Sequence, residues 1–322
     1  MTTLYLVLPC YNEEEVLPET AKRLRQKYDD LLAAGRISPD SRIVFVDDGS
    51  KDKTWRLIRQ LHESDKVFSG VKQSRNRGHQ NAVWCGLMTV RERCDAAISM
   101  DADLQDDIDA IDGMLDKFQK EGCDVVYGVR SSRQTDTFFK RTTAEGYYTL
   151  MDKLGVDLVF NHADYRLMSR RALEALSQFK EVNLFLRGMV PLVGFKSDVV
   201  TYERSERFAG ESKYPLSKML ALAFEGVASF STKPIKFISV AGLLSGLLGL
   251  VLTVVNLVRM ALGSPTAGLA ALISSLWILG GILLLAIGIV GGYVGKTYLE
   301  SKGRPRYIVE EFLHTKEDKS SC

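Results

Sequence analysis

Two aspartates and a glutamine stand at alternate positions directly after an apolar run. They are Asp101, Asp103 and Gln105, and the run covers residues 96–100. Because positions i and i+2 of a strand point to the same side, the three side chains can direct oxygen atoms at one point. Hard cations such as Mg²⁺ and Mn²⁺ prefer oxygen ligands. The spacing therefore predicts a metal site with room for substrate phosphates, and it indicates chemistry on a nucleotide diphosphate.

The same spacing recurs at Asp107 and Asp109, where it opens a helical pattern of apolar residues. Acidic side chains in the first turn complement the helix dipole. We interpret this second pair as a helix start and not as a second metal site.

The overall composition excludes some classes of protein. The 322 residues carry 42 Lys and Arg against 40 Asp and Glu, and this net charge of +2 gives no field that would favour nucleic acid. The five cysteines form no C-x-x-C pair, which indicates reduced thiols in a cytosolic compartment. The N-terminus leads directly into an apolar run, so we expect no signal peptide.

Apolar runs alternate with helical patterns through the first part of the chain. We expect strands at 4–8, 43–46, 67–73, 96–100 and 124–128, and helices at 13–34, 53–64 and 80–91, with a fourth that ends near 120. Strands that are apolar throughout and alternate with helices indicate a mostly parallel sheet that is covered on both faces. The sequence therefore predicts an α/β domain.

Polar side chains follow each of these five strands, at the edge where ligands bind in such sheets. They occupy 9–13, 47–50, 74–78, Asp101 with Asp103, and Arg130 with Arg133. Aromatic, acidic and basic groups at one edge predict a nucleotide-sugar cleft. No G-x-G-x-x-G sequence follows the first strand, which disfavours a dinucleotide site.

Two long uncharged stretches come after the α/β pattern, at 237–258 and 260–295. A helix of about 20 residues crosses a hydrocarbon core of about 30 Å, so we predict two spans, the second over 269–294. Basic residues flank the outer ends of both stretches, so we expect a multi-pass plasma-membrane protein with the catalytic domain and both termini in the cytoplasm. Glycines at four-residue spacing favour close helix packing and a homo-oligomer such as a tetramer.

Apolar residues recur at helical spacing between 216 and 230, just before the first predicted span. This helix can pack on the core of the domain, or it can lie in the membrane interface. We favour the interface, because a lipid acceptor must deliver its phosphate to the cleft while its tail stays in the bilayer.

Several motifs follow one another in a fixed order: Leu8-Pro9-Cys10-Tyr11-Asn12-Glu13, Val46-Asp47-Asp48-Gly49-Ser50, Asn76-Arg77-Gly78 and Asp101-Ala102-Asp103-Leu104-Gln105. Together they resemble the signature of glycosyltransferase family 2, which has a GT-A fold. With residues 161–166, residues 207–213 and the two spans, the chain is similar to the polyisoprenyl-phosphate glycosyltransferase branch. That branch includes dolichol-phosphate mannose synthase and bacterial undecaprenyl-phosphate glucosyltransferases.

The resemblance implies roles for individual residues. It implies nucleotide binding by Pro9, Tyr11, Glu13, Asp47, Arg77, Asp101 and Ala102. It implies Mg²⁺ or Mn²⁺ binding by Asp101, Asp103 and Gln105, and catalytic roles for Asp103, Asp164 and Arg166. Candidates for the phosphate of the lipid acceptor are Arg130, Arg133, Arg207, Ser212 and Lys213.

Structural alternatives stay open for some of these residues. Pro9 can terminate a strand, Glu13 can be an acid of a first helical turn, and Asp164 with Arg166 can be a buried structural pair. Asp48 is suited to a turn or a helix N-cap, so we favour Asp47 over Asp48 as a nucleotide ligand.

We therefore predict four parts: a cytoplasmic GT-A catalytic domain over 1–210, an interfacial amphipathic helix region over 211–236, a two-helix transmembrane hairpin over 237–295 and a cytoplasmic tail over 296–322. The expected enzyme is an inverting, metal-dependent hexosyltransferase. It moves a hexose from a UDP-sugar to undecaprenyl or another polyprenyl phosphate for cell-envelope glycosylation. We expect glucose as the first choice of sugar and N-acetylglucosamine as the second. A flippase is a further expected partner.

Two other functions compete with this prediction. A processive polysaccharide synthase would carry a Gln-x-x-Arg-Trp motif, which none of Trp55, Trp84 and Trp277 provides. A non-catalytic membrane scaffold would be expected to lose the metal ligands, yet Asp101, Asp103 and Gln105 are all present.

Overall fold

The computed structural model describes residues 1–131, 162–203 and 268–314, together with isolated helical positions between 238 and 258. The chain divides into two compact units. The first contains Met1–Tyr148, Asp157–Pro215 and Arg304–Cys322, and the second contains Thr149–Val156 and Leu216–Gly303. The two units are considered separately below.

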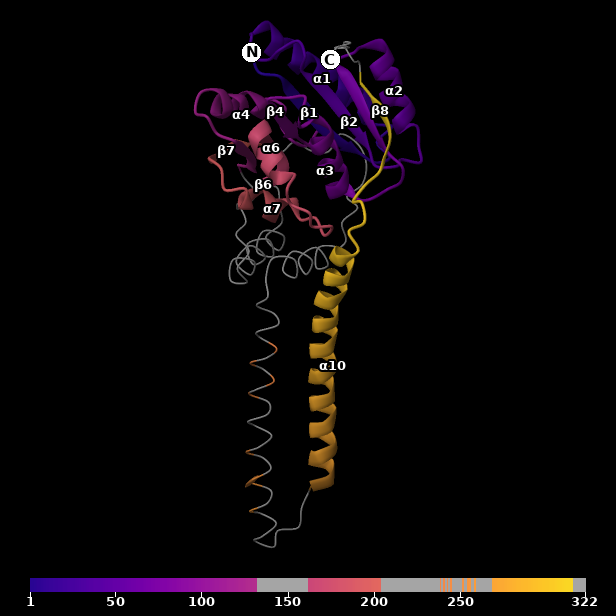
Figure 1. The fold of residues 1–322 in the computed structure, drawn as a ribbon, viewed down its shortest axis with the longest axis vertical. Coiled ribbons are helices and arrows are strands. Elements are labelled where there is room, and N and C mark those ends of the chain that lie inside the picture. The colour runs from indigo at the N-terminus through magenta and orange to yellow at the C-terminus, as the bar shows by residue number, and fades with distance from the viewer. Residues whose placement is uncertain are drawn as a thin grey trace. The chain divides into compact units, whose positions relative to one another are not determined.

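The described part of the first unit is built on an eight-stranded sheet with the order β7-β5-β6-β4-β1-β2-β3-β8 (Figure 1). The strands are β1 (Leu4–Cys10), β2 (Arg42–Asp47), β3 (Phe68–Gln73), β4 (Ala96–Ser99), β5 (Val125–Arg130), β6 (His162–Ser169), β7 (Ser197–Tyr202) and β8 (Val309–Leu313). Only β6 and β8 run antiparallel to their neighbours. The predicted α/β domain with a mostly parallel sheet is therefore confirmed.

Helices cover both faces of this sheet. They are α1 (Leu17–Ala33), α2 (Thr54–Ser64), α3 (His79–Val90), α4 (Ala110–Gln119), α6 (Arg170–Leu176) and α7 (Leu186–Leu192). Alternate β1 residues point to opposite faces, so Leu6 and Leu8 join the core formed with α1, α2 and α4. Val7 faces α3, where a side chain at Gly86 would meet it at 2.4 Å. Helix α3 therefore lies directly on β1.

Helix α1 begins later than the predicted residue 13. Residues 12–15 form a loop that is tied to the segment after β2: the Asn12 N–H donates to Ser50 Oγ (3.0 Å), and the Glu13 N–H donates to Thr54 Oγ1 (2.9 Å). Pro18 then stands in the first turn of the helix, where its missing N–H is tolerated.

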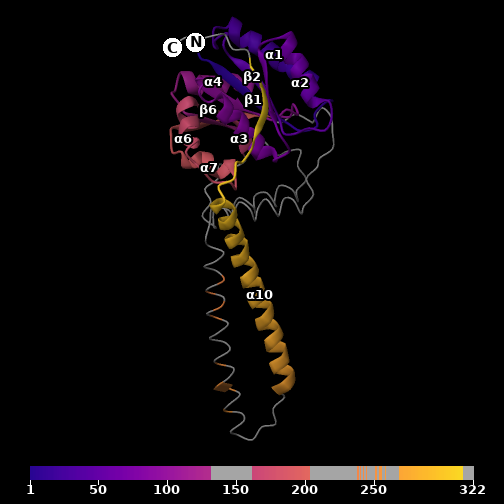
Figure 2. The same ribbon diagram turned by 45° about the vertical axis from the view of Figure 1, so that its right-hand side comes forward.

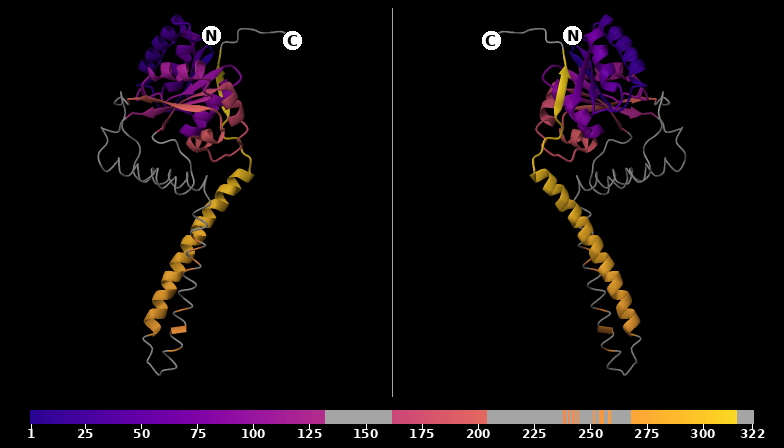
Figure 3. Two further views of the ribbon diagram at one scale, coloured as in Figure 1. Left: turned by 90° about the vertical axis from the view of Figure 1, so that its left-hand side faces the viewer. Right: turned by 90° about the vertical axis from the view of Figure 1, so that its right-hand side faces the viewer.

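The C-terminal part of the chain adds an edge strand that the sequence analysis did not anticipate. Strand β8 pairs antiparallel with β3, with Gly70 opposite Leu313. Lys72 lies 2.9 Å from Glu310, and Arg59 lies 2.8 Å from Glu311. Figures 2 and 3 show this strand in yellow along the edge of the sheet. A segment within the predicted cytoplasmic tail thus belongs to the sheet of the first unit.

The described part of the second unit is dominated by helix α10 (Gly268–Ser301), which covers the second predicted span. Its Ile282–Ser301 segment is long and apolar enough to cross a membrane, and none of that segment is buried within the protein. It is the one helix in the described residues that meets this criterion. The first predicted span lies mostly outside the described residues, and the predicted interfacial helix region over 211–236 lies entirely outside them. The two-helix hairpin therefore remains a prediction.

Candidate active site

The strand directions bring the predicted site residues to one edge of the sheet. Strands β1 to β5 run in one direction, so their carboxyl ends share that edge. Because β6 runs the opposite way, its beginning, with Asp164, lies at the same edge. Arg133, Arg207, Ser212 and Lys213 lie outside the described residues, so their predicted roles stay predictions.

The loop after β1 is held rigidly against the loop after β2. Asn12 has a left-handed backbone with φ of 54°, which asparagine tolerates well. Its side-chain oxygen accepts a hydrogen bond from the Lys51 N–H at 2.9 Å. The neighbouring Tyr11 side chain is exposed. The connections between the loops thus hold Tyr11 in place beside the second loop.

Two of the structural alternatives do not describe this loop. Pro9 is buried inside β1, which continues to Cys10, so Pro9 does not terminate the strand. Glu13 precedes the start of α1 at Leu17 and is therefore not an acid of its first turn. The predicted nucleotide-binding roles of both residues stay open.

Asp47 is fully buried at the end of β2, yet half of its carboxylate lacks a protein partner. Its Oδ1 accepts from the Ser50 N–H at 3.1 Å, whereas Oδ2 has no hydrogen bond in the described residues. Burial raises the pKa of Asp47, and the hydrogen bonds from Ser50 only partly oppose this rise. A buried acceptor without a partner is costly unless a ligand supplies the donor. Asp47 is therefore suited to accept from a nucleotide.

Asp48 has a different task, because its carboxylate holds the loop after β3. Oδ1 accepts from the Arg77 N–H at 2.7 Å, and Oδ2 accepts from the Gly78 N–H at 2.9 Å. Between the two loops stands Gly49, with φ of +69°, where a Cβ would come within 2.6 Å of the Asn76 nitrogen. Asp48 and Gly49 thus place Arg77, which is half-buried, at the same edge as Asp47.

The candidate metal ligands lie in a turn and not on an extended strand. Strand β4 ends at Ser99, and Leu104 adopts a left-handed backbone with φ of 59°. This turn directs the Gln105 N–H back to Asp103 Oδ1 at 3.2 Å. The carbonyl of Ala102 accepts from Thr20 Oγ1 at 2.8 Å, which attaches the turn to α1. The prediction assumed that these residues continue the strand, whereas the structure places them in a turn that is held by hydrogen bonds.

The charges around Asp101 fit a divalent cation. The pKa of Asp101 is raised to about 6, mainly by burial and also by the nearby charges of Asp106, Asp164 and Asp103, while the charge of His79 opposes this rise. Several oxygen donors with surplus negative charge match the preference of Mg²⁺ and Mn²⁺. Asp101, Asp103 and Gln105 are thus the residues that would hold such an ion.

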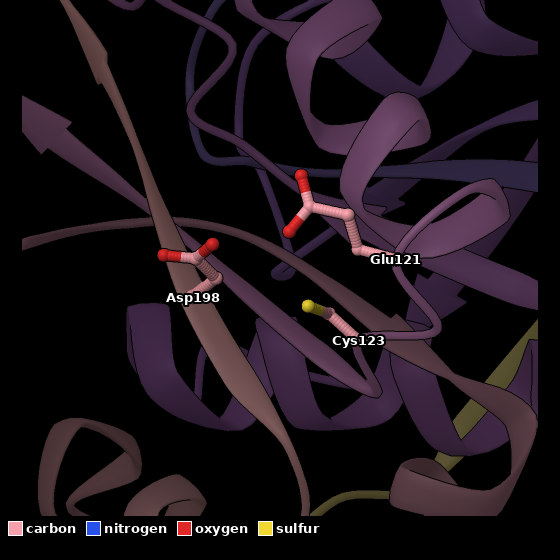
Figure 4. Close-up of side chains that lie close together, drawn as sticks. All are labelled: Glu121, Cys123 and Asp198. Carbon is pink, nitrogen blue, oxygen red and sulfur yellow. The ribbon is translucent and has the colours of Figure 1, made fainter.

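A second acidic group lies at the opposite edge of the sheet and does not compete with this site. Figure 4 shows Glu121, Cys123 and Asp198, whose ligand atoms lie within 4.8 Å of one another. Lys117 Nζ lies 2.5 Å from Asp198 and 3.6 Å from Glu121. Both carboxylates of this group are therefore already ion-pair partners of one lysine.

Asp164 is surrounded by cationic side chains. Arg166, which is only 1% exposed, places its Nη2 at 2.5 Å from Oδ1. Arg187 places its Nη2 at 3.3 Å from Oδ2. Burial raises the pKa of Asp164, but Arg187, His79 and Arg166 lower it more, so the pKa lies well below its usual value. Asp164 is thus ionised at neutral pH, and it forms the buried ion pair with Arg166 that was one of the two alternatives.

His79 connects Asp164 to the candidate metal site, and sequence reasoning missed it. Its Nε2 lies 3.6 Å from both Asp101 Oδ1 and Asp164 Oδ2. Burial lowers the pKa of His79, but the two carboxylates outweigh burial and raise it to about 9. A charged imidazole thus stands between the two acids. The only signal in the sequence was its position directly after the Asn76-Arg77-Gly78 motif.

Arg130 lies at the end of β5, within 3.7 Å of Asp106. Asp106 is buried and also accepts a hydrogen bond from the Tyr202 hydroxyl on β7. Sequence reasoning singled out Arg130 but neither of the two residues that hold it. Asp107 and Asp109 precede α4, as the helix-start interpretation predicted.

Comparison with known proteins identifies close relatives of the chain. The family model described as "Glycosyl transferase family 2" matches residues 5–177. An uncharacterised glycosyltransferase of Bacillus subtilis, YkoT, is 51% identical over 98% of this chain and 93% of its own length. A bactoprenol glucosyl transferase of Shigella phage SfV is 40% identical over 95% of this chain and 97% of its own length.

Among solved structures, the chain is similar to glucosyl-3-phosphoglycerate synthase of Mycobacterium tuberculosis. The TM-score is 0.46 and the identity 18%, over 70% of this chain and 76% of that one. A likeness this distant carries no argument about function.

Proposed function

Because the chain belongs to glycosyltransferase family 2, we propose that it transfers glucose from UDP-glucose to a polyprenyl phosphate. The observation that carries the proposal is the arrangement at the sheet edge. There the acidic turn with Asp101 and Asp103 lies beside Asp164, which is ringed by cations. The names of the bactoprenol glucosyl transferases support glucose as the sugar and a polyprenyl carrier as the acceptor.

The donor half of the proposed site is formed by the loops after β1, β2 and β3. Asp47 offers a buried carboxylate oxygen that needs a donor, which a base N–H or a ribose hydroxyl would supply. Tyr11 would flank the base. Pro9, Glu13, Arg77 and Ala102 complete the proposed nucleotide-binding set.

A divalent ion is part of the proposal. Mg²⁺ or Mn²⁺ held by Asp101, Asp103 and Gln105 would neutralise charge on the departing UDP. By holding this ion, the three side chains would also determine where the diphosphate binds, at the carboxyl end of β4. The rest of the proposed reaction involves only the two substrates and the side chains of the protein.

The proposed reaction needs no strong base. A phosphate monoester has its second pKa near 6, so the acceptor is mostly dianionic at pH 7. One of its oxygens attacks the anomeric carbon from the face opposite UDP. As this C–O bond forms, the bond from the anomeric carbon to the UDP oxygen breaks, and its electron pair leaves with UDP. The configuration inverts, and the site contributes positioning and charge compensation.

The membrane part of the proposal follows from the apolar segments. Helix α10 would be the second of two spans, with the first over 237–258 and an interfacial helix region over 211–236. Both chain ends would lie in the cytoplasm, where UDP-sugars and the phosphate end of the lipid can meet. A homo-oligomer and a flippase that takes the product across the membrane complete the proposal.

A labelling assay tests this function. Membranes that contain the protein receive undecaprenyl phosphate, Mg²⁺ or Mn²⁺, and one of a panel of radiolabelled UDP-sugars. We expect label in the organic phase from UDP-glucose, and less from UDP-N-acetylglucosamine. Labelled polymer would support a processive synthase instead. Release of UDP without labelled lipid would contradict the proposed acceptor.

A further inference from the structure

A second arginine contacts Asp164, and no sequence motif pointed to it. We propose that Arg187 binds the phosphate group of the acceptor and that Asp164 is the positioning residue that orients its guanidinium. This inference rests on the proposed function and deepens it by naming the residue that recognises the acceptor. It also gives Asp164 a role other than that of a general base.

The two arginines on Asp164 differ in burial and in contact length. Arg166 is 1% exposed, contacts Oδ1 at 2.5 Å and donates through Nη1 to the Leu186 carbonyl at 3.3 Å. Arg187 has 34% of its side chain exposed and contacts the carboxylate at 3.3 and 3.4 Å. Arg166 therefore makes its contacts inside the protein, whereas Arg187 is partly exposed at a surface that a ligand can approach.

The backbone beside Arg187 is held from two directions. The Leu186 N–H donates to Gln80 Oε1 at 2.9 Å, and the Leu186 carbonyl accepts from the buried Arg166. Gln80 lies in the first turn of α3, directly after His79. The start of α7 is thus connected to both α3 and β6, which fixes the position from which Arg187 extends.

The order of the strands places Arg187 on the acceptor side. The loops proposed for the nucleotide follow β1, β2 and β3, which lie on one side of β4 in the sheet. Asp164, to which Arg187 is bonded, lies on β6 at the other side of β4. The proposed metal ligands follow β4 itself and lie between the two. A group that attacks from the face opposite UDP would arrive on the side of β6.

The charges also favour an anion at this position. The single carboxylate of Asp164 faces two arginines, Arg166 and Arg187, of which only Arg166 is fully buried. A guanidinium presents several N–H donors in a planar fork that matches the oxygens of a phosphate. Arg187 can therefore share its donors between Asp164 and a phosphate monoester.

The test compares the full-length Arg187→Ala and Arg187→Lys proteins with wild type. We expect Arg187→Ala to raise the apparent KM for undecaprenyl phosphate roughly ten- to a hundredfold, as for lost hydrogen bonds to a charged group. The KM for UDP-glucose and the binding of UDP with Mn²⁺ by calorimetry should stay at wild-type values. The apparent KM of Arg187→Lys for undecaprenyl phosphate should lie between those of wild type and Arg187→Ala, because lysine keeps the positive charge but lacks the planar fork of N–H donors.

Arg91→Ala is the matched control. Its side chain is 35% exposed, close to that of Arg187, but it lies at the far end of α3 next to Glu92. Arg91→Ala should leave the KM for undecaprenyl phosphate and the KM for UDP-glucose unchanged. Wild-type UDP binding by Arg187→Ala shows that the variant is folded. Inorganic phosphate as a competitor separates the headgroup from the lipid: it should inhibit wild type competitively with the lipid and lose this effect in Arg187→Ala.

A second variant tests the role of Asp164. Asp164→Asn keeps the shape but loses the charge that orients Arg187, so it should raise the KM for the lipid more than it lowers kcat. A loss confined to kcat would assign Asp164 to proton transfer and overturn its positioning role. An unchanged lipid KM in Arg187→Ala, or a raised KM for UDP-glucose, would overturn the assignment of Arg187. A wild-type protein that labels no lipid would instead refute the proposed function itself, and the acceptor assignment with it.

Discussion

Nη2 of Arg166 lies 2.5 Å from Oδ1 of Asp164, and the arginine side chain is 1% exposed. A guanidinium buried this deeply is stable only with its counter-ion. The ion pair therefore does two things at once: it completes the interior between β6 and α7, and it fixes one oxygen of a carboxylate at the edge of the candidate site. This dual position leads to the first prediction.

Replacing Arg166 with methionine should destabilise the protein by about 3 kcal/mol or more, because a buried carboxylate loses its closest partner. Chemical unfolding of the full-length protein in detergent, followed by tryptophan fluorescence, measures this change. Arg23→Met is the control, since its ion pair with Glu19 on the surface of α1 is 50% and 30% exposed and should contribute less than about 1 kcal/mol. Equal effects of the two substitutions would contradict the structural role of Arg166.

Gly49 and Gly122 give a second prediction, because both have a left-handed backbone but only Gly49 is closely packed. Both have a left-handed backbone, with φ of +69° and +67°, but a Cβ at Gly122 meets nothing within 4 Å. Gly122→Ala should therefore cost only the backbone strain, about 1 kcal/mol. Gly49→Ala also forces the Cβ against the Asn76 backbone, so it should cost more and weaken UDP binding. Thermal unfolding and calorimetry measure the two effects, and normal UDP binding by Gly49→Ala would contradict the proposed nucleotide loops.

The segment that leads into β8 should depend on Arg306. Its guanidinium lies 4.2 Å from the centre of the Trp84 ring and donates to the Phe179 carbonyl. Arg306→Ala should destabilise this attachment by about 1–2 kcal/mol. The measurement is the rate of proteolytic cleavage within 304–314, which should rise. Arg304→Ala, an exposed neighbour, serves as the control, and a rate equal to wild type for Arg306→Ala would refute the attachment.

His314 gives a prediction about pH. Burial, together with Arg93 and Arg42, lowers its pKa from 6.5 to about 4. Between these two values the unfolded chain binds a proton that the folded protein does not, so this residue makes stability fall as the pH drops from about 6.5 to about 4. His314→Phe should therefore lose less stability than wild type between pH 8 and pH 5. A loss equal to that of wild type in this interval would show that His314 is not the group responsible.

The sequence was sufficient for the local elements of the sheet but not for its long-range pairings. Apolar runs and helical periodicity identified β1 to β5 and α1 to α4, because the pattern of apolar residues within each element depends on which of its faces is buried. Strand β6 pairs with β4 and β5, and β8 pairs with β3 from the far end of the chain. Such pairings depend on where a distant segment returns, which no local pattern records.

The same distinction applies to the candidate site. Asp47, Asp101 and Asp164 could be recognised because they stand in motifs or at strand ends. His79 and Arg187 could not, since their importance arises from contacts with Asp164 that form only in the fold. The turn at Leu104 was also unforeseen, because a left-handed backbone at leucine has no signature in the sequence.

The central claim is that this edge of the sheet transfers glucose to a lipid phosphate, and Asp103→Ala tests it most directly. The measurement is the initial rate at which label passes from radiolabelled UDP-glucose to undecaprenyl phosphate with Mn²⁺ present. Asp109→Ala is the control, an exposed acid close by that pairs with Lys27. We predict that Asp103→Ala lowers the rate roughly a hundredfold or more while Asp109→Ala keeps it. Transfer by Asp103→Ala at the wild-type rate would contradict the account.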